Sequence, residues 1–90
     1  MKESTLTRDI LKALNAMPRT KAIKLHGSAF VERGTPDVLV VSDGRVWFLE
    51  VKRPGKHPTR LQTRRLLEWR NAGASVAVVR GMNDLAMFHA

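Results

Sequence analysis

Apolar residues recur every three or four positions between residues 3 and 17, which is the spacing of a helix with one apolar face. Pro18 ends this helix, because its ring removes an amide hydrogen and clashes with the preceding turn. From residue 21 to residue 26 the period becomes an imperfect two, which predicts a short strand that Gly27 breaks. The chain is therefore expected to begin with a helix and a strand.

Two longer apolar runs flank the dipeptide Asp43-Gly44, which is among the strongest signals for a β-hairpin because glycine accepts the positive φ of a two-residue type I′ turn. A turn at these residues places Asp37 directly opposite Glu50 on the neighbouring strand. Away from the two acids both faces of the hairpin are apolar. We therefore expect its strands to lie centrally in a sheet that is covered on both faces.

Helical spacing returns at residues 59–71, where Thr59 is the expected N-cap and Gly73 lies near the C-cap. On a helical wheel, Leu66 and Trp69 define the face that should be buried. This segment is expected to be the second helix, and it connects the hairpin to whatever strand follows.

A β-branched run at 75–80 predicts a final strand, and Asn83 is expected to begin a short last helix. The predicted order is α-β-β-β-α-β with a terminal helix. It is an α/β fold with a mixed central sheet, in which the last strand runs parallel to the Glu50 strand through a right-handed crossover. Ninety residues suffice for one modest core, so we expect a single domain over residues 1–90.

Sixteen Lys and Arg residues against eight Asp and Glu give a net charge of +8, which points to a polyanionic partner such as DNA, RNA or anionic lipid. A membrane partner is disfavoured, since no apolar run approaches the ~20 residues needed to span a bilayer, and the N-terminus lacks the apolar core of a signal peptide. The absence of cysteine excludes disulfides and thiolate metal sites, so a cytoplasmic location is the default. The three histidines are too far apart in the sequence to suggest a zinc site.

Asp37 and Glu50 would lie on one face of the hairpin, in a pair whose Cα atoms approach to roughly 4.5 Å. Two like charges that close are destabilising, whereas a divalent cation between them turns the repulsion into coordination. Lys52 shares this face. These residue types suit phosphodiester hydrolysis, in which the carboxylates hold Mg²⁺ or Mn²⁺ and Lys52 orients or deprotonates the attacking water. A salt bridge from Lys52 to either acid, without chemistry, is the structural alternative.

The Pro36-Asp37 and Glu50-Val51-Lys52 motifs resemble those of the PD-(D/E)xK nuclease superfamily. The Gly34-Thr35-Pro36-Asp37 lead-in, the run from Glu50 to Gly55 and a Gln62 on the next helix are similar to one branch, the virus-type replication-repair nuclease (VRR-NUC) family. The resemblance covers residues 3–84 and suggests a small, standalone member. It implies a restriction-endonuclease-like core, whose order of elements is the one predicted above.

The resemblance also implies the members of the site. The catalytic residues would be Asp37, Glu50, Lys52 and Gln62, and the metal ligands would be Asp37, Glu50, the carbonyl of Val51 and Glu3. Gln62 lies within the apolar stripe of its helix at the first turn, and the alternative is an amide that simply binds water. Glu3 falls in the apolar arc of the first helix, where its alternative is an acid that interacts favourably with the helix dipole.

Basic residues flank the predicted site, and we expect them to bind the DNA backbone rather than base edges. They are Arg33 before the hairpin and Lys56, Arg60, Arg64 and Arg65 after it. For each of them, solvation alone is the alternative.

These features favour a divalent-metal-dependent, structure-selective DNA endonuclease without a small-molecule cofactor or a membrane partner. The resemblance implies a homodimeric resolvase of four-way (Holliday) junctions. The candidate interface residues are apolar residues not easily assigned to the core, and burial in the core is the alternative for each: Phe30, Val31, Met87 and Phe88. Two alternatives stay open: a non-catalytic, basic nucleic-acid-binding accessory module, and a nuclease without junction preference. Ninety residues leave little room for the recognition element of a sequence-specific restriction enzyme.

Overall fold

A computed structural model describes residues 1–25 and 31–88 of the chain. Its elements are α1 (Glu3–Asn15), β1 (Thr20–Lys24), β2 (Val38–Ser42), β3 (Arg45–Val51), α2 (Arg60–Asn71), β4 (Ser75–Val79) and the 3-10 helix η1 (Met82–Phe88). This is the predicted α-β-β-β-α-β order with a terminal helix. Among the described residues, no helix is long and apolar enough to cross a membrane.

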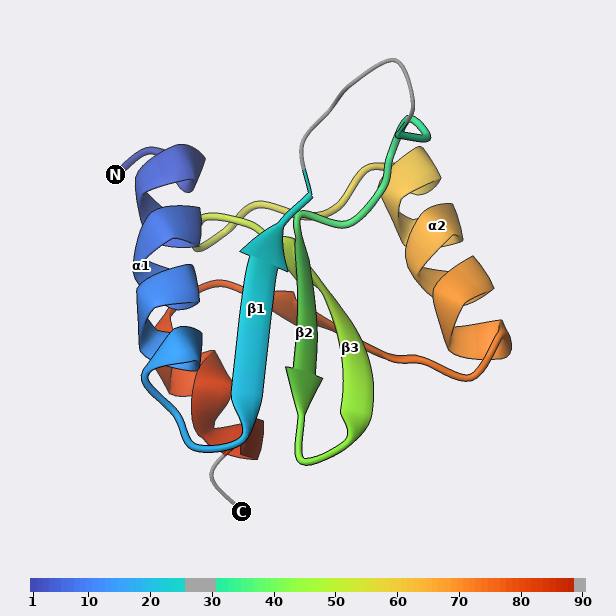
Figure 1. Ribbon diagram of the computed structural model, residues 1–90. Coiled ribbons are helices and arrows are strands. Elements are labelled where there is room, and N and C mark those ends of the chain that lie inside the picture. The colour runs from blue at the N-terminus through green and yellow to red at the C-terminus, as the bar shows by residue number, and fades with distance from the viewer. Residues whose placement is uncertain (26–30, 89–90) are drawn as a thin grey trace.

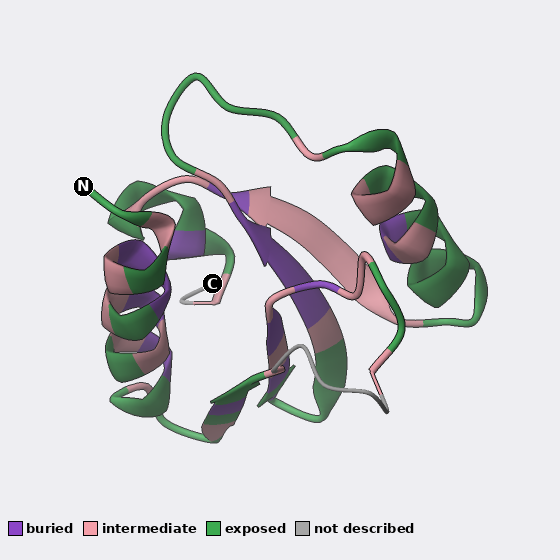
Figure 2. Cartoon of the chain, turned by 90° about the horizontal axis from the view of Figure 1, so that it is seen from above, coloured by how far each residue is buried: buried purple, intermediate pink, exposed green. Residues whose placement is uncertain are grey.

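The four strands form one mixed sheet in the order β1-β2-β3-β4. β1, β2 and β3 are antiparallel neighbours, whereas β4 runs parallel to β3, as predicted. Helices cover the sheet from both sides: α1 and η1 lie on one side and α2 on the other (Figures 1 and 2). The sheet is thus the middle layer of the domain, and its ends are the places where segments from different layers can meet.

The predicted hairpin turn is confirmed. Asp43 and Gly44 both have positive φ, at 49° and 77°, as a type I′ turn requires. The register follows from the turn, with Ser42 opposite Arg45 and the ladder running out to the pair of Val38 and Leu49.

The first helix ends two residues earlier than predicted, at Asn15. The Asn15 side chain hydrogen-bonds both backbone groups of Ala22: its Nδ2 donates to the Ala22 carbonyl at 3.0 Å and its Oδ1 accepts from the Ala22 amide at 2.8 Å. The Asn15 side chain thus satisfies the backbone hydrogen-bonding groups of Ala22 on the edge strand β1 and connects that strand to α1. β1 begins at Thr20 and ends at Lys24, and the end predicted for it, at residue 26, lies outside the described residues. β4 ends at Val79, one residue early, and the last helix begins at Met82 rather than after Asn83.

The core lies between α1 and the sheet. Helix α1 directs Leu6, Ile10 and Leu14 toward it, at the helical spacing read from the sequence. The residues of the sheet and of η1 that complete this core are Ala22, Val38, Val40, Leu49, Val51, Val79 and Leu85. The hairpin is therefore supported by one buried apolar interface, on the face of the sheet that α1 covers.

The opposite face of the sheet is only partly covered, so the prediction of two covered faces was wrong near the hairpin turn. Helix α2 packs over β3 and β4, where the Trp69 ring stacks on Phe48 with centroids 4.0 Å apart, and Leu66 is buried as predicted. Trp69 itself stays 38% exposed, contrary to prediction. Near the turn Val41 and Val46 are 41% and 40% exposed, and on the same face of the edge strand β1 Ile23 is 46% exposed. These three residues form an apolar face, called the open face below.

Candidate nuclease active site

Asp37 is fixed between two strands at the end of the sheet. Its carboxylate Oδ2 accepts a hydrogen bond from the Val51 amide at 2.7 Å, and its backbone carbonyl accepts one from the Leu25 amide at 2.8 Å. The regular pairing of β2 with β3 ends at Val38 and Leu49. Beyond that pair, the Asp37 side chain accepts the hydrogen bond of the β3 backbone at Val51. The hairpin thus positions this carboxylate firmly beside the Glu50-Val51-Lys52 motif.

Glu50 is a buried acid, and one of its two carboxylate oxygens has no hydrogen-bond partner among the described residues. The residue is only 1% exposed, and that oxygen is Oε1. Burial raises the pKa of Glu50 from its ordinary 4.5 to about 9, with further increases from the hydrogen bonding and charge of Asp37. Lys52 lowers this pKa and Glu3 raises it slightly. Without a cation, Glu50 therefore keeps a proton at neutral pH.

Lys52 lies just beyond β3, where its amide donates to the Val79 carbonyl at 3.0 Å. Its side chain is half-buried and close enough to Glu50 to stabilise the ionised carboxylate. Among the described residues, however, no ion pair within 4.0 Å joins Lys52 to a carboxylate. The structural alternative, a salt bridge that occupies Lys52, is thus not observed.

The structure brings Glu3 into the electrostatic neighbourhood of the site but not into a metal cluster. Glu3 is the first residue of α1, and its charge acts on Glu50. Within residues 1–25 and 31–88, no three His, Cys, Asp or Glu side chains gather closely enough to hold a metal ion. The Val51 amide is engaged by Asp37, while the roles predicted for the Val51 carbonyl and for Glu3 stay predictions.

Gln62 has a structural task that the sequence reading missed. Its side-chain Oε1 accepts a hydrogen bond from the backbone amide of Thr59 at 2.8 Å, and the backbone amide of Gln62 donates to the Thr59 hydroxyl at 3.1 Å. This is a capping box, and the signal for it, Thr59 followed three residues later by Gln, is present in the sequence. A catalytic role for Gln62 stays a prediction.

Helix α2 also holds the segment that leads to Asp37. Arg65 Nε donates to the Arg33 carbonyl at 3.0 Å and lies 3.5 Å from a Glu32 oxygen. Gly34 approaches α2 so closely that an added Cβ would stand 2.7 Å from Leu61 Cγ, and its φ is +80°. The Arg65 side chain is thus largely buried against residues 32–34, and its contacts there are structural. The prediction that it contacts DNA took only its charge into account.

The other predicted DNA contacts are surface residues. Arg33, Lys56 and Arg60 are exposed and form no ion pair among the described residues, whereas Arg64 lies 3.6 Å from Glu68. Their side chains are available to a polyanion.

Two solved structures share this fold. One, described as a VRR_NUC domain, matches with a TM-score of 0.67 and 28% sequence identity over 94% of this chain and 87% of its own. The other, a VRR_NUC domain protein, matches with a TM-score of 0.75 and 16% identity over 97% of this chain and 84% of its own. No family model and no curated protein matches the sequence. The chain thus shares its fold with VRR_NUC domains over nearly its whole length, in agreement with the family that its Pro36-Asp37 and Glu50-Val51-Lys52 motifs resemble.

Proposed function

We propose that this protein is a divalent-metal-dependent DNA endonuclease. The observation that supports it best is the buried Oε1 of Glu50, which has no partner in the part of the chain that the structure describes and lies beside the fixed carboxylate of Asp37. A purely structural site would not be expected to leave a buried acid without a partner, since the cost of desolvation is then uncompensated.

The donor set fits a hard cation. Asp37, Glu50 and the Val51 carbonyl would supply only oxygen atoms, which suits Mg²⁺ or Mn²⁺ rather than a softer metal. Glu50 would hold the ion as a carboxylate, which requires it to release to solvent the proton that it otherwise keeps. The ion, when bound, supplies positive charge at the phosphate that is hydrolysed.

The remaining chemistry belongs to the chain itself. Asp37 holds its orientation through the Val51 amide, so the carboxylate needs no rearrangement before the substrate arrives. Lys52, which lacks a carboxylate partner among the described residues, orients the attacking water and stabilises negative charge on the phosphate. Arg33, Lys56 and Arg60 bind the DNA backbone on either side, as the net charge of +8 favours.

We further propose that the enzyme acts as a homodimer that resolves four-way junctions, because two symmetric incisions require two sites and a two-fold dimer supplies them. The interface predicted from sequence needs revision. Phe30 lies outside the described residues, and Phe88 packs on Trp47 with ring centroids 5.0 Å apart. The open face, whose apolar side chains are exposed in one copy, is the better candidate.

A cleavage assay tests the proposal. Purified protein is incubated with labelled four-way junctions and with linear duplex of the same sequence, with Mg²⁺, with Mn²⁺ or with EDTA. Metal-dependent cutting of the junction supports a resolvase, and equal cutting of both substrates supports a nuclease without junction preference. DNA binding without cleavage in any metal would instead favour the accessory module with structural carboxylates.

A further inference from the structure

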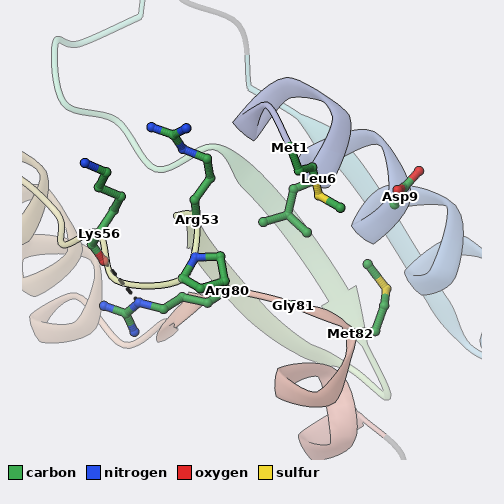
Figure 3. A pocket seen from close by; sticks show the side chains of 9 residues that line it. Met1, Leu6, Asp9, Arg53, Lys56, Arg80, Gly81 and Met82 are labelled. Atoms are coloured by element: carbon green, nitrogen blue, oxygen red, sulfur yellow. Dashed lines mark hydrogen bonds between the residues drawn. The ribbon is translucent and has the colours of Figure 1, made fainter.

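A cavity of about 620 Å³ lies between the start of α1, the loop after β3 and the segment after β4. Figure 3 shows Leu6 and Met82 reaching toward it from opposite sides. Pro54 adds a third apolar wall. Its volume falls in the range of about 300–1,000 Å³ that is usual for sites of small organic groups.

The rim of this cavity is cationic. Arg53, Lys56 and Arg80 line it, and none of the three forms an ion pair among the described residues. The one acid in the lining, Asp9, lies 3.5 Å from Arg8 and is thus partly neutralised. An apolar interior with an unpaired basic rim suits a ligand that combines a flat organic group with phosphate.

The cavity is held open by contacts of its own. Arg80 Nε donates to the Lys56 carbonyl at 3.1 Å, and the Arg80 guanidinium lies 3.3 Å from His57 Nδ1. These contacts tie the loop after β3 to the segment after β4, as Figure 3 shows for Arg80 and Lys56. The wall therefore does not need the ligand in order to form.

The cavity lies at the same end of the sheet as the proposed site. Its rim residue Arg53 directly follows Lys52. Glu50 and Phe48 share the face of β3 that α2 covers, whereas the cavity is walled by α1, so a DNA strand that passes around the end of the sheet would meet both the site and the cationic rim.

We propose that this cavity receives one unpaired nucleobase of the DNA strand that is cut, with the adjacent phosphates on Arg53 and Lys56. The inference rests on the proposed nuclease function and gives it a physical basis for selecting branched DNA. A base in a regular duplex must leave its stack to enter such a cavity, whereas an unpaired base at a branch pays much less of that cost. Because the cavity would contact the base mainly through apolar surface, binding would depend little on which base it is.

The test compares binding by matched variants in EDTA, so that no cleavage occurs. Met82 and Met87 both lie on η1 and are 44% and 37% exposed, but only Met82 lines the cavity. Met82→Glu and Met87→Glu change the net charge equally. The probe is a duplex with one unpaired 2-aminopurine at a branch, measured by anisotropy and by 2-aminopurine fluorescence, with the paired duplex as reference.

We expect Met82→Glu to weaken binding of the branched probe about tenfold, as loss of one base contact would, and to remove the change in 2-aminopurine fluorescence. Met87→Glu should bind it like the wild type. Gly81→Leu provides a second variant that fills the cavity by bulk alone, because a Cβ at Gly81 meets no atom within 4 Å. Ala86→Leu on the exposed side of η1 is its control.

Equal binding and equal fluorescence for the cavity variants and their controls would overturn the inference, even if the wild type cleaves DNA. Conversely, a wild type that shows the 2-aminopurine response but cleaves nothing with Mg²⁺ or Mn²⁺ would support base binding and reject the proposed function. The two failures are therefore distinguishable.

Discussion

The carboxylate of Asp37 accepts a hydrogen bond from the amide of Val51 at 2.7 Å, across the point where their strands separate. One acid of the site is thus oriented by the backbone of the residue that follows the other acid, Glu50. The two acids therefore differ: Asp37 has a backbone partner, whereas Glu50 has an oxygen with no partner within residues 1–25 and 31–88.

Asp37→Asn should abolish metal-dependent cleavage, by at least about 100-fold, while the protein stays folded. Asparagine keeps an oxygen that can accept from the Val51 amide, but it lacks the negative charge that a cation requires. Cleavage rates and thermal melting of the purified variant provide the measurement. Asp43→Asn, at the exposed hairpin turn where asparagine tolerates the positive φ, is the control for a lost acid. Retained cutting by Asp37→Asn, in a preparation free of contaminating nuclease, would contradict the assignment.

The free energy of unfolding of the metal-free protein should fall as pH rises from about 4.5 to about 9. In this window the folded state keeps the Glu50 proton that the unfolded chain releases, so the folded state binds more protons. The slope is at most about 1.4 kcal/mol per pH unit. Denaturant titrations in EDTA at constant ionic strength would measure it.

Glu50→Gln should flatten this slope and be more stable than the wild type near pH 8, because the wild type must take up a proton in order to fold at that pH and the amide need not. Glu68→Gln removes an exposed acid and should leave the slope in place. A Glu50→Gln variant that retains the wild-type slope would show that another group is responsible.

Gly34→Ala should destabilise the protein and lower cleavage. The substitution combines a positive φ with a contact of 2.7 Å to Leu61 Cγ, in the segment that leads to Asp37. Gly55→Ala is a close match for the backbone effect alone, since its φ is +83° and its Cβ would meet no atom within 4 Å. We expect Gly34→Ala to cost about 1–3 kcal/mol more than Gly55→Ala in chemical denaturation. Equal losses would mean that α2 yields to the new side chain.

DNA affinity should fall steeply with salt, with a slope of about 0.9 per neutralised phosphate on logarithmic axes. Arg60→Ala should weaken binding similarly for all sequences and reduce that slope by about 1. Arg19, which pairs with Asp43 at the hairpin turn, provides the control, because Arg19→Ala removes the same charge far from the site. A flat plot of affinity against salt would contradict a footprint made mainly on phosphates.

Val41→Glu should convert a homodimer to a monomer without unfolding it, because the side chain is exposed in one copy and would be buried with a like charge in two. Light scattering at micromolar concentration measures the change. Met87→Glu tests the interface that the sequence suggested and should leave the dimer intact. A wild type that is monomeric at these concentrations would remove the dimer from the proposal.

The sequence predicted the hairpin and its register because both depend on local chemistry. Asp43-Gly44 can form the turn without help from the rest of the chain, and the pairing of Ser42 with Arg45 then follows. The motif residues Asp37 and Glu50 were brought to one end of the sheet by the same local rule.

Other features depend on how the layers fit together, and no local pattern contains that information. A helical wheel gives the direction of Trp69 but not how far the sheet extends beneath it, so its exposure could not be foreseen. Arg65 was predicted to contact DNA because of its charge, whereas in the fold its side chain donates to the Arg33 carbonyl and holds the segment before Asp37 against α2. The missing partner of Glu50 likewise depends on the burial of the assembled site.

The capping box at the start of α2 sets the polarity of the surface that this helix can offer to a substrate. The carbonyl oxygen of Gln62 accepts a hydrogen bond from the Thr59 amide, which uses one of its two lone pairs and fixes the orientation of the side-chain amide. The amino group at the other corner of that amide carries two donors and no acceptor. While the cap is intact, the contact with DNA that this orientation favours is therefore a hydrogen bond donated to a phosphate oxygen.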